Sequence, residues 1–280
     1  MPKLRTLLVM AATAVVAGSL RISRRPLDTR KARYAEALPY LTRVFADIAK
    51  FECVSGIEVR DDIEQVCKAI VNRLAAAFSL ITGTKCSACI KTYIDGPGEE
   101  RPRVATLCRD DASLEREQGP SPLEAWIQYL QNPETVSHWI DENTAYRQFF
   151  GRESTPQRCY FSNDLPAEPH YHNTSFKIYG DPPEPDDPTI REHHWPLPYK
   201  STIVAPIGRL TIPGNHYDLV GFLAVDSRSR DVFSKQYDID LTLGVADSLF
   251  NLVDAHLQLL HAEIQAEQGG DDEEEGTGEN

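Results

Sequence analysis

The order in which helical and extended patterns follow one another is what most constrains the fold of this chain. Residues 61–82 carry apolar side chains at helical spacing, and Gly83 follows them as a helix-ending residue. Two extended runs come next, at 85–94 and 103–109, and the turn-forming residues 95–98 separate them. Neighbouring strands joined by a short loop pair antiparallel. A helix followed by such a hairpin excludes a purely helical or purely parallel architecture.

The rest of the chain continues this mixture of elements. Residues 159–161, 202–207 and 219–225 predict three more strands, and 123–130 and 143–150 predict helical pieces. Together these elements predict an α+β fold, an antiparallel sheet with helices packed on it.

A long helix is predicted after the last of these strands. Ser234 is its expected N-cap, and its apolar seam predicts either a dimer contact or a cover for the sheet. The seam consists of Leu243, Phe250, Val253, Leu257, Leu260 and Ile264.

Composition and charge exclude several classes of protein. The 280 residues are 41% hydrophobic and 25% charged, as expected for a globular protein with a core. The net charge is −13, although residues 1–34 carry eight basic residues and one acid. An acidic body does not attract nucleic acid non-specifically. Residues 266–280, rich in glycine and acids, predict a disordered acidic tail.

Six cysteines are too few for a disulfide scaffold in a chain of this length, and we expect a reducing compartment. Cys86 and Cys89 resemble a metal or redox pair. Their separation of three in a strand instead places the two thiols on opposite faces of the sheet.

The N-terminal segment allows three interpretations. Residues 4–22 carry no charge apart from Arg5 and Arg21. This pattern is compatible with a signal anchor, a cleaved signal peptide or an ordinary helix. More basic residues follow the segment than precede it, so an anchor places the body at the cytoplasmic face of the inner membrane. We divide this end into residues 1–30, the apolar segment with its basic flank, and 31–58, a connecting helix. That helix is predicted over 34–51, with Pro39 in its first turn.

Residues 165–198 form a long irregular excursion of the kind that often makes a lid or binding loop. Four of the eight histidines lie in it, at 170, 172, 193 and 194, together with acidic residues. Solvated loop histidines are the default interpretation, and a site for a divalent metal is the alternative. We predict no metal site.

The run from Gly221 to Val253 resembles the closing strand and helix of a GAF domain. The matching residues are Gly221, Leu223, Val225, Asp226, Phe233, Ser234, Ala246, Asp247 and Leu249. Residues 199–207 and 160–164 resemble the preceding strand and a pocket-edge strand. The resemblance spans residues 60–262 and implies a profilin-like, six-stranded antiparallel sheet with helices on one face. It also implies a ligand pocket on the other face.

The resemblance suggests where a ligand would bind. Asn163 and Asp164 end a strand at the expected pocket rim, where they contact a polar ligand or merely satisfy turn backbone. Tyr171 either lines the pocket or anchors its loop. The full set of candidate ligand-binding residues is Phe149, Tyr160, Asn163, Asp164, Tyr171, Ser201 and Thr202.

Three functional hypotheses follow, without a name for the ligand or any cofactor. The first is a regulatory module that binds a small molecule and signals through terminal helices. The second is a ligand-free dimeric scaffold, paired through helices 34–51 and 240–264 and tethered near a membrane. The third is an enzyme using Cys159 or Cys108, which we disfavour. The chain lacks the clustered cysteines of methionine-sulfoxide-reducing GAF domains and the Cys-His pair of bilin-binding ones.

Overall fold

A computed structural model describes residues 29–51, 60–94, 101–116, 138–150, 158–183, 188–211 and 216–270. Residues 29–51 form a helix. The main elements after it are α2 (Arg60–Thr82), β1 (Cys86–Ile94), β2 (Arg103–Arg109), β3 (Tyr160–Ser162), β4 (Ser201–Thr211), β5 (His216–Ser227), α7 (Asp238–Ser248) and α8 (Phe250–Gly270).

The strands form one antiparallel sheet in the order β2-β1-β5-β4-β3. The predicted hairpin of 85–94 and 103–109 is confirmed as β1 and β2. The described part of the chain contains five strands of this sheet, where the resemblance implied six. An isolated bridge between Arg103 and Trp139 lies beside the outer strand β2.

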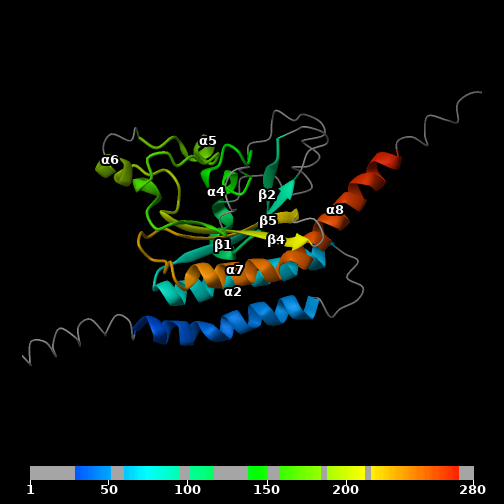
Figure 1. Cartoon of the computed structure of the whole chain (residues 1–280), viewed down its shortest axis with the longest axis horizontal. Helices are drawn as coiled ribbons and strands as arrows, with labels where there is room; N and C mark the ends of the chain where they lie inside the picture. Colours follow the sequence, from blue (N-terminus) through cyan, green and yellow to red (C-terminus); the bar gives the residue numbers. More distant parts are fainter. Residues whose placement is uncertain are drawn as a thin grey trace, which may run out of the picture.

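One face of the sheet is covered by helices. Figure 1 shows α2 and α7 beneath the sheet, and the helix of residues 29–51 beneath α2. Residues of α2, such as Leu74 and Phe78, are fully buried in the core between these layers. We call this side of the sheet the helix face.

The first helix differs from the prediction. It begins by residue 29 rather than 34, so Pro39 lies in its interior instead of its first turn. The additional turn carries Arg30 and Arg33, which bind α7 and the end of α2. These contacts hold the helix beyond the proline, although proline removes one backbone hydrogen bond.

The predicted long C-terminal helix is divided into two. α7 ends at Ser248 and α8 starts at Phe250. Ser234 is not its N-cap; its backbone N–H instead donates to the Asp238 carboxylate, because the helix begins four residues later. α8 runs to Gly270, past residue 266, where the sequence predicts the tail to begin.

The apolar seam of this helix is used inside the chain. Its buried members include Leu243, Phe250 and Val253, which belong to the core on the helix face. The first part of the seam therefore covers the sheet and is not available as a dimer surface.

The opposite face of the sheet, which we call the far face, is covered by irregular segments and short helices. These helices are α4 (Thr144–Arg147), η3 (Leu165–Ala167), α5 (Phe176–Tyr179) and α6 (Pro188–His193). η1 (Asp111–Arg116) lies at the edge of the sheet, from Asp111 beside Asn72 of α2 to Arg116 beside Ser87 on the far face. Figure 1 shows α4, α5 and α6 above the sheet, opposite α2 and α7. A second apolar cluster lies here, built on Phe222 of β5.

Gly221 of β5 lies close against the backbone of β1. A Cβ atom at this position would lie 2.2 Å from the Lys91 carbonyl oxygen. This separation is too short for any side chain, so pairing of β5 with β1 requires glycine here.

Several predictions fall outside the described residues: the segment 4–22, the turn at 95–98, the helix at 123–130 and the end of the acidic tail. Among the described helices, none combines the length and hydropathy needed to span a bilayer.

Candidate functional site

A row of polar side chains crosses the far face at one end of the sheet. Asp226 of β5 lies between Ser87 of β1 and Thr202 of β4 in the strand register. The Thr202 hydroxyl donates a hydrogen bond of 2.6 Å to the Asp226 carboxylate, which is buried. Burial raises the pKa of Asp226, and the charge of Arg116 and the bond from Thr202 lower it to a smaller extent.

Arg116 brings a positive charge to this row. It ends η1, and its side chain is only 10% exposed. One terminal nitrogen donates to the Ser87 hydroxyl at 3.0 Å, and the other lies 3.9 Å from an Asp226 oxygen. At 3.9 Å, Arg116 and Asp226 form an ion pair, but their atoms are too far apart for a hydrogen bond.

Two more cations stand on the same face. Lys91 follows two strand positions after Cys89, and Arg109 pairs with Cys89 across β1 and β2. Both charges act on the buried Asp226 carboxylate. They also help burial to lower the pKa of His138 to about 3. The floor of the site is therefore a region of positive potential around one carboxylate.

A hydrogen-bonded group of tyrosines covers the row. The Asn173 side-chain amide donates to the hydroxyls of Tyr171 and Tyr199, at 3.0 and 3.1 Å. Burial raises the pKa of both tyrosines, with a further contribution from the Asp226 charge. Both hydroxyls therefore stay protonated and act as neutral donors and acceptors near Asp226.

Aromatic rings close the site from above. Trp195 and Phe176 pack on Tyr171, with ring centroids 5.9 and 6.2 Å from it. Tyr146 and Phe149 pack on Phe222, at 4.7 and 5.5 Å. Residues 146–149 and the irregular excursion thus supply aromatic cover on the far face.

Four of the seven predicted ligand-binding residues lie on the far face: Phe149, Tyr160, Tyr171 and Thr202. Tyr160 stacks on Tyr171, and its hydroxyl donates to Glu168. Thr202 belongs to the polar row itself, and Tyr171 belongs to the tyrosine group that Asn173 joins.

The other three predicted residues lie at the rim, where two bind backbone and the third forms an ion pair. The Asn163 side chain pairs with both the N–H and the carbonyl of Phe233, at 3.0 and 2.9 Å. The Ser201 hydroxyl donates to the carbonyls of Asn163 and Ser229. Asp164 forms an ion pair with Arg230. These residues hold the loop that follows β5.

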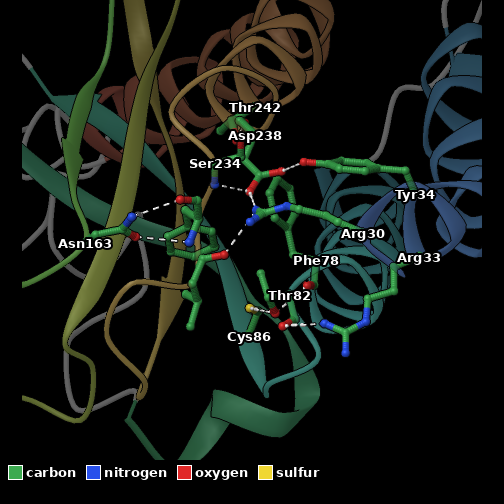
Figure 2. Close-up of polar contacts among 12 residues, drawn as sticks. Arg30, Arg33, Tyr34, Phe78, Thr82, Cys86, Asn163, Ser234, Asp238 and Thr242 are labelled. Atoms are coloured by element: carbon green, nitrogen blue, oxygen red, sulfur yellow. Dashed lines mark hydrogen bonds and ion pairs between the residues drawn. The ribbon is translucent and has the colours of Figure 1, made fainter. Parts of the chain in front are cut away.

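That loop connects the rim to the first helix. Figure 2 shows Asn163 on one side of residues 232–238, and Arg30 with Tyr34 on the other. Arg30 donates to the Val232 carbonyl and to the buried Asp238 carboxylate, which also accepts from the Tyr34 hydroxyl. One short loop therefore contacts both the site and the helix of residues 29–51.

The sequence analysis did not place Asp226, Arg116, Asn173 or Tyr199 in the site. Asp226 belongs to the family motif, and a charged residue within an apolar strand is the signal that could have indicated its role. Arg116 offered no signal, because it lies in a short helix far from β5 in sequence.

Cysteine and histidine chemistry is weakly supported. The predicted separation of Cys86 and Cys89 is confirmed, since they belong to the cores on opposite faces. A contact with the Cys67 thiol and burial raise the pKa of Cys108 well above its usual value, and burial raises that of Cys159. The described residues contain no group of three or more His, Cys, Asp or Glu arranged to hold a metal.

No protein-family model and no curated protein matches the chain. Solved structures that resemble it include GAF domains. One is the GAF domain of a phosphoenolpyruvate-protein phosphotransferase from Coxiella burnetii, with 15% identity and a TM-score of 0.43; the match covers 82% of this chain and 97% of that one.

Two other similar structures have different activities. A free methionine-R-sulfoxide reductase from Thermoplasma acidophilum has 12% identity, a TM-score of 0.39, and coverage of 70% of this chain and 97% of its own. The phycocyanobilin-bound GAF domain of a cyanobacterial phytochrome has 14% identity, a TM-score of 0.37, and coverage of 81% and 96%. Because these likenesses concern the fold, the function has to be argued from this chain's own side chains.

Proposed function

We propose that this chain is a sensory module that binds a small molecule on the far face of its sheet, beneath residues 143–200. The observation that carries the proposal is the buried polar row of Ser87, Asp226 and Thr202 with Arg116 beside it. Buried charges cost folding free energy, and a fold tends to keep such groups where they have a task.

The loop at 232–238 is the proposed route from ligand to output. Movement of the rim residue Asn163 would displace the Phe233 backbone, and Asp238 would pass the change to Arg30 and Tyr34. Ligand binding would then change how tightly residues 29–51 hold to the body.

The binding half of the proposal is tested by a thermal-denaturation screen of metabolites, with native mass spectrometry of the purified chain. We expect at least one ligand that stabilises the wild type and is weakened by Thr202→Val. Thr202→Ser, which keeps the hydroxyl, is the matched control. The proposal would be contradicted if the screen found no stabilising metabolite and mass spectrometry found no small molecule bound to the purified chain.

The signalling half is tested by amide hydrogen exchange of residues 29–51 with and without that ligand. We expect ligand to alter exchange in the wild type. Tyr34→Phe and Arg30→Met should keep the affinity but lose this response, because they break the contacts with Asp238. Arg43→Met, at an exposed position of the same helix, should respond like the wild type. An unchanged wild-type helix would refute the route.

A dimeric scaffold is the second candidate, and one observation favours it. Leu38 and Phe45, seven residues apart on the first helix, are 58% and 39% exposed. Large apolar side chains at this spacing form one stripe of a helix and favour pairing with another helix. Light scattering of the wild type and of a Leu38→Lys, Phe45→Lys variant tests the idea, and a monomeric wild type would end it.

The enzyme hypothesis remains the weakest of the three. A thiol needs a lowered pKa to act as a nucleophile, whereas those of Cys108 and Cys159 are raised. We retain the proposal that the chain is not an enzyme; thiol alkylation that abolished a turnover would overturn it.

Attachment to a membrane is also proposed, from the sequence alone. The apolar residues 4–22 and the basic residues after them support an anchor with the body on the cytoplasmic side of the inner membrane. Protease treatment of right-side-out vesicles should leave the body intact, and a full-length chain recovered without membranes would exclude the anchor.

A further inference from the structure

We propose that the ligand of the far-face site is an anion, a small molecule whose carboxylate or phosphate group binds Arg116. This inference rests on the proposed function and specifies the chemical class that the site accepts.

The Arg116 side chain carries the argument. Its nitrogen Nη1 is buried and has no hydrogen-bond partner in the described part of the protein. The other terminal nitrogen donates to Ser87, which fixes the guanidinium plane against β1. A buried donor without an acceptor is costly, and a planar guanidinium edge matches the two oxygens of a carboxylate or phosphate.

The nearest carboxylate of the chain does not satisfy this donor. Asp226 lies 3.9 Å away, and its other oxygen is held by the Thr202 hydroxyl at 2.6 Å. Thr202 therefore holds the Asp226 carboxylate toward β4, whereas the Arg116 guanidinium is held against Ser87 of β1. The Nη1 donor of Arg116 is therefore left for a second anion.

The surroundings favour negative charge in the ligand. Lys91 and Arg109 lie on the same face, and both lower the pKa of the nearby Cys89 thiol, although burial raises it overall. Coulomb interactions are strong in such a poorly solvated site, so the positive potential acts on any charged ligand that enters. The Tyr171 and Tyr199 hydroxyls add neutral hydrogen-bonding groups nearby.

The test uses the full-length chain, with inorganic phosphate and acetate as separate probes at constant ionic strength maintained with chloride. Calorimetric titration and thermal denaturation are measured for the wild type, Arg116→Gln and Arg116→Lys. We expect saturable binding of phosphate or acetate to the wild type, and the stronger probe identifies the preferred oxyanion.

We expect Arg116→Gln to weaken this binding about 10- to 100-fold, the effect of removing a hydrogen bond to a charged group. The affinity of Arg116→Lys should lie between those of the wild type and Arg116→Gln, since lysine keeps the charge but lacks the planar guanidinium. Arg101→Gln is the matched control, because Arg101 is an exposed arginine paired with Asp141 and Glu142. It should bind like the wild type.

The results separate this inference from the proposed function. Neither probe binding to the wild type, or equal binding to Arg116→Gln, overturns the anion site. If the metabolite screen finds a neutral or cationic ligand that Thr202→Val weakens, the sensory function stands and the anion inference fails. If the screen finds no ligand of any charge, the sensory function fails. Circular dichroism of Arg116→Gln and Arg116→Lys shows whether loss of binding reflects loss of the fold.

Discussion

The two faces of the sheet carry different kinds of side chain. On the helix face, β1 and β5 present Cys86, Ala88, Ile90 and Val225 to α2 and α7. On the far face the same strands present residues such as Lys91 and Asp226, beneath irregular segments. A strand alternates its side chains between faces, so a single sequence serves both purposes. The helix face contributes stability, and the far face carries polar groups that cost stability.

The sharpest test of this division removes one ring from each face. Phe78→Ala, on the helix face, should lower the free energy of unfolding by about 3–5 kcal/mol. Phe176→Ala, on the far face, should cost less, because its neighbours Tyr171 and Trp195 lie in irregular segments that can move into the space. Urea denaturation measures both, and equal losses would remove the distinction.

The polar row predicts the next largest effect. Thr202→Val should lower the free energy of unfolding by about 1.5–3 kcal/mol, since it removes a hydrogen bond to a buried carboxylate. It should also raise the pKa of Asp226 further, because the charged form loses a donor. Urea denaturation at several pH values reports both changes. Thr202→Ser should retain most of the stability, and a loss as large as that of the valine variant would point to packing instead.

Acid should weaken the far face through His138. Its pKa is lowered to about 3 in the folded chain, chiefly by burial, so the unfolded chain binds the proton more readily. Stability should therefore fall as pH drops from about 6.5 toward 3, with a slope of at most about 1.4 kcal/mol per pH unit from this group. His138→Gln should show a shallower decline between pH 6.5 and 4.5. An unchanged profile would mean that His138 is solvated.

The smallest effect is expected outside both faces. Arg101→Gln removes exposed ion pairs with Asp141 and Glu142 and should change stability by less than about 1 kcal/mol. Thermal denaturation at low and high salt measures this change. A larger loss would show that the segment around Trp139, over which the Arg101 guanidinium lies, depends on this contact.

The sequence could predict the helix face better than the far face, for a physical reason. Helical spacing in 61–82 and the extended runs of the hairpin are local patterns, and both appear as α2, β1 and β2. Gly83 ends α2 as predicted, with a φ of +72°. The additional turn before Pro39 was missed, because a contact with the distant residue Asp238 holds it. The break between α7 and α8 was also missed.

The candidate site could be predicted only in part. Thr202 and Tyr171 were named in advance, since polar and aromatic residues near strand ends were visible in the sequence. Arg116 could not be predicted from the sequence, because its position depends on η1 folding back over Ser87, which is 29 residues away. Asn163 was predicted at the rim with two alternative roles, and its side chain satisfies the backbone of Phe233.

The close approach of β5 to β1 at Gly221 also fixes where the acidic residue of the site lies. Because a side chain at Gly221 would collide with the Lys91 carbonyl, the two strands meet at a distance set by a missing methyl group. Asp226 stands farther along the same strand, opposite Ser87 and within reach of Arg116. The same register that sets Gly221 opposite Thr92 sets Asp226 opposite Ser87, so the location of the buried acid depends on a steric fit five residues away along β5.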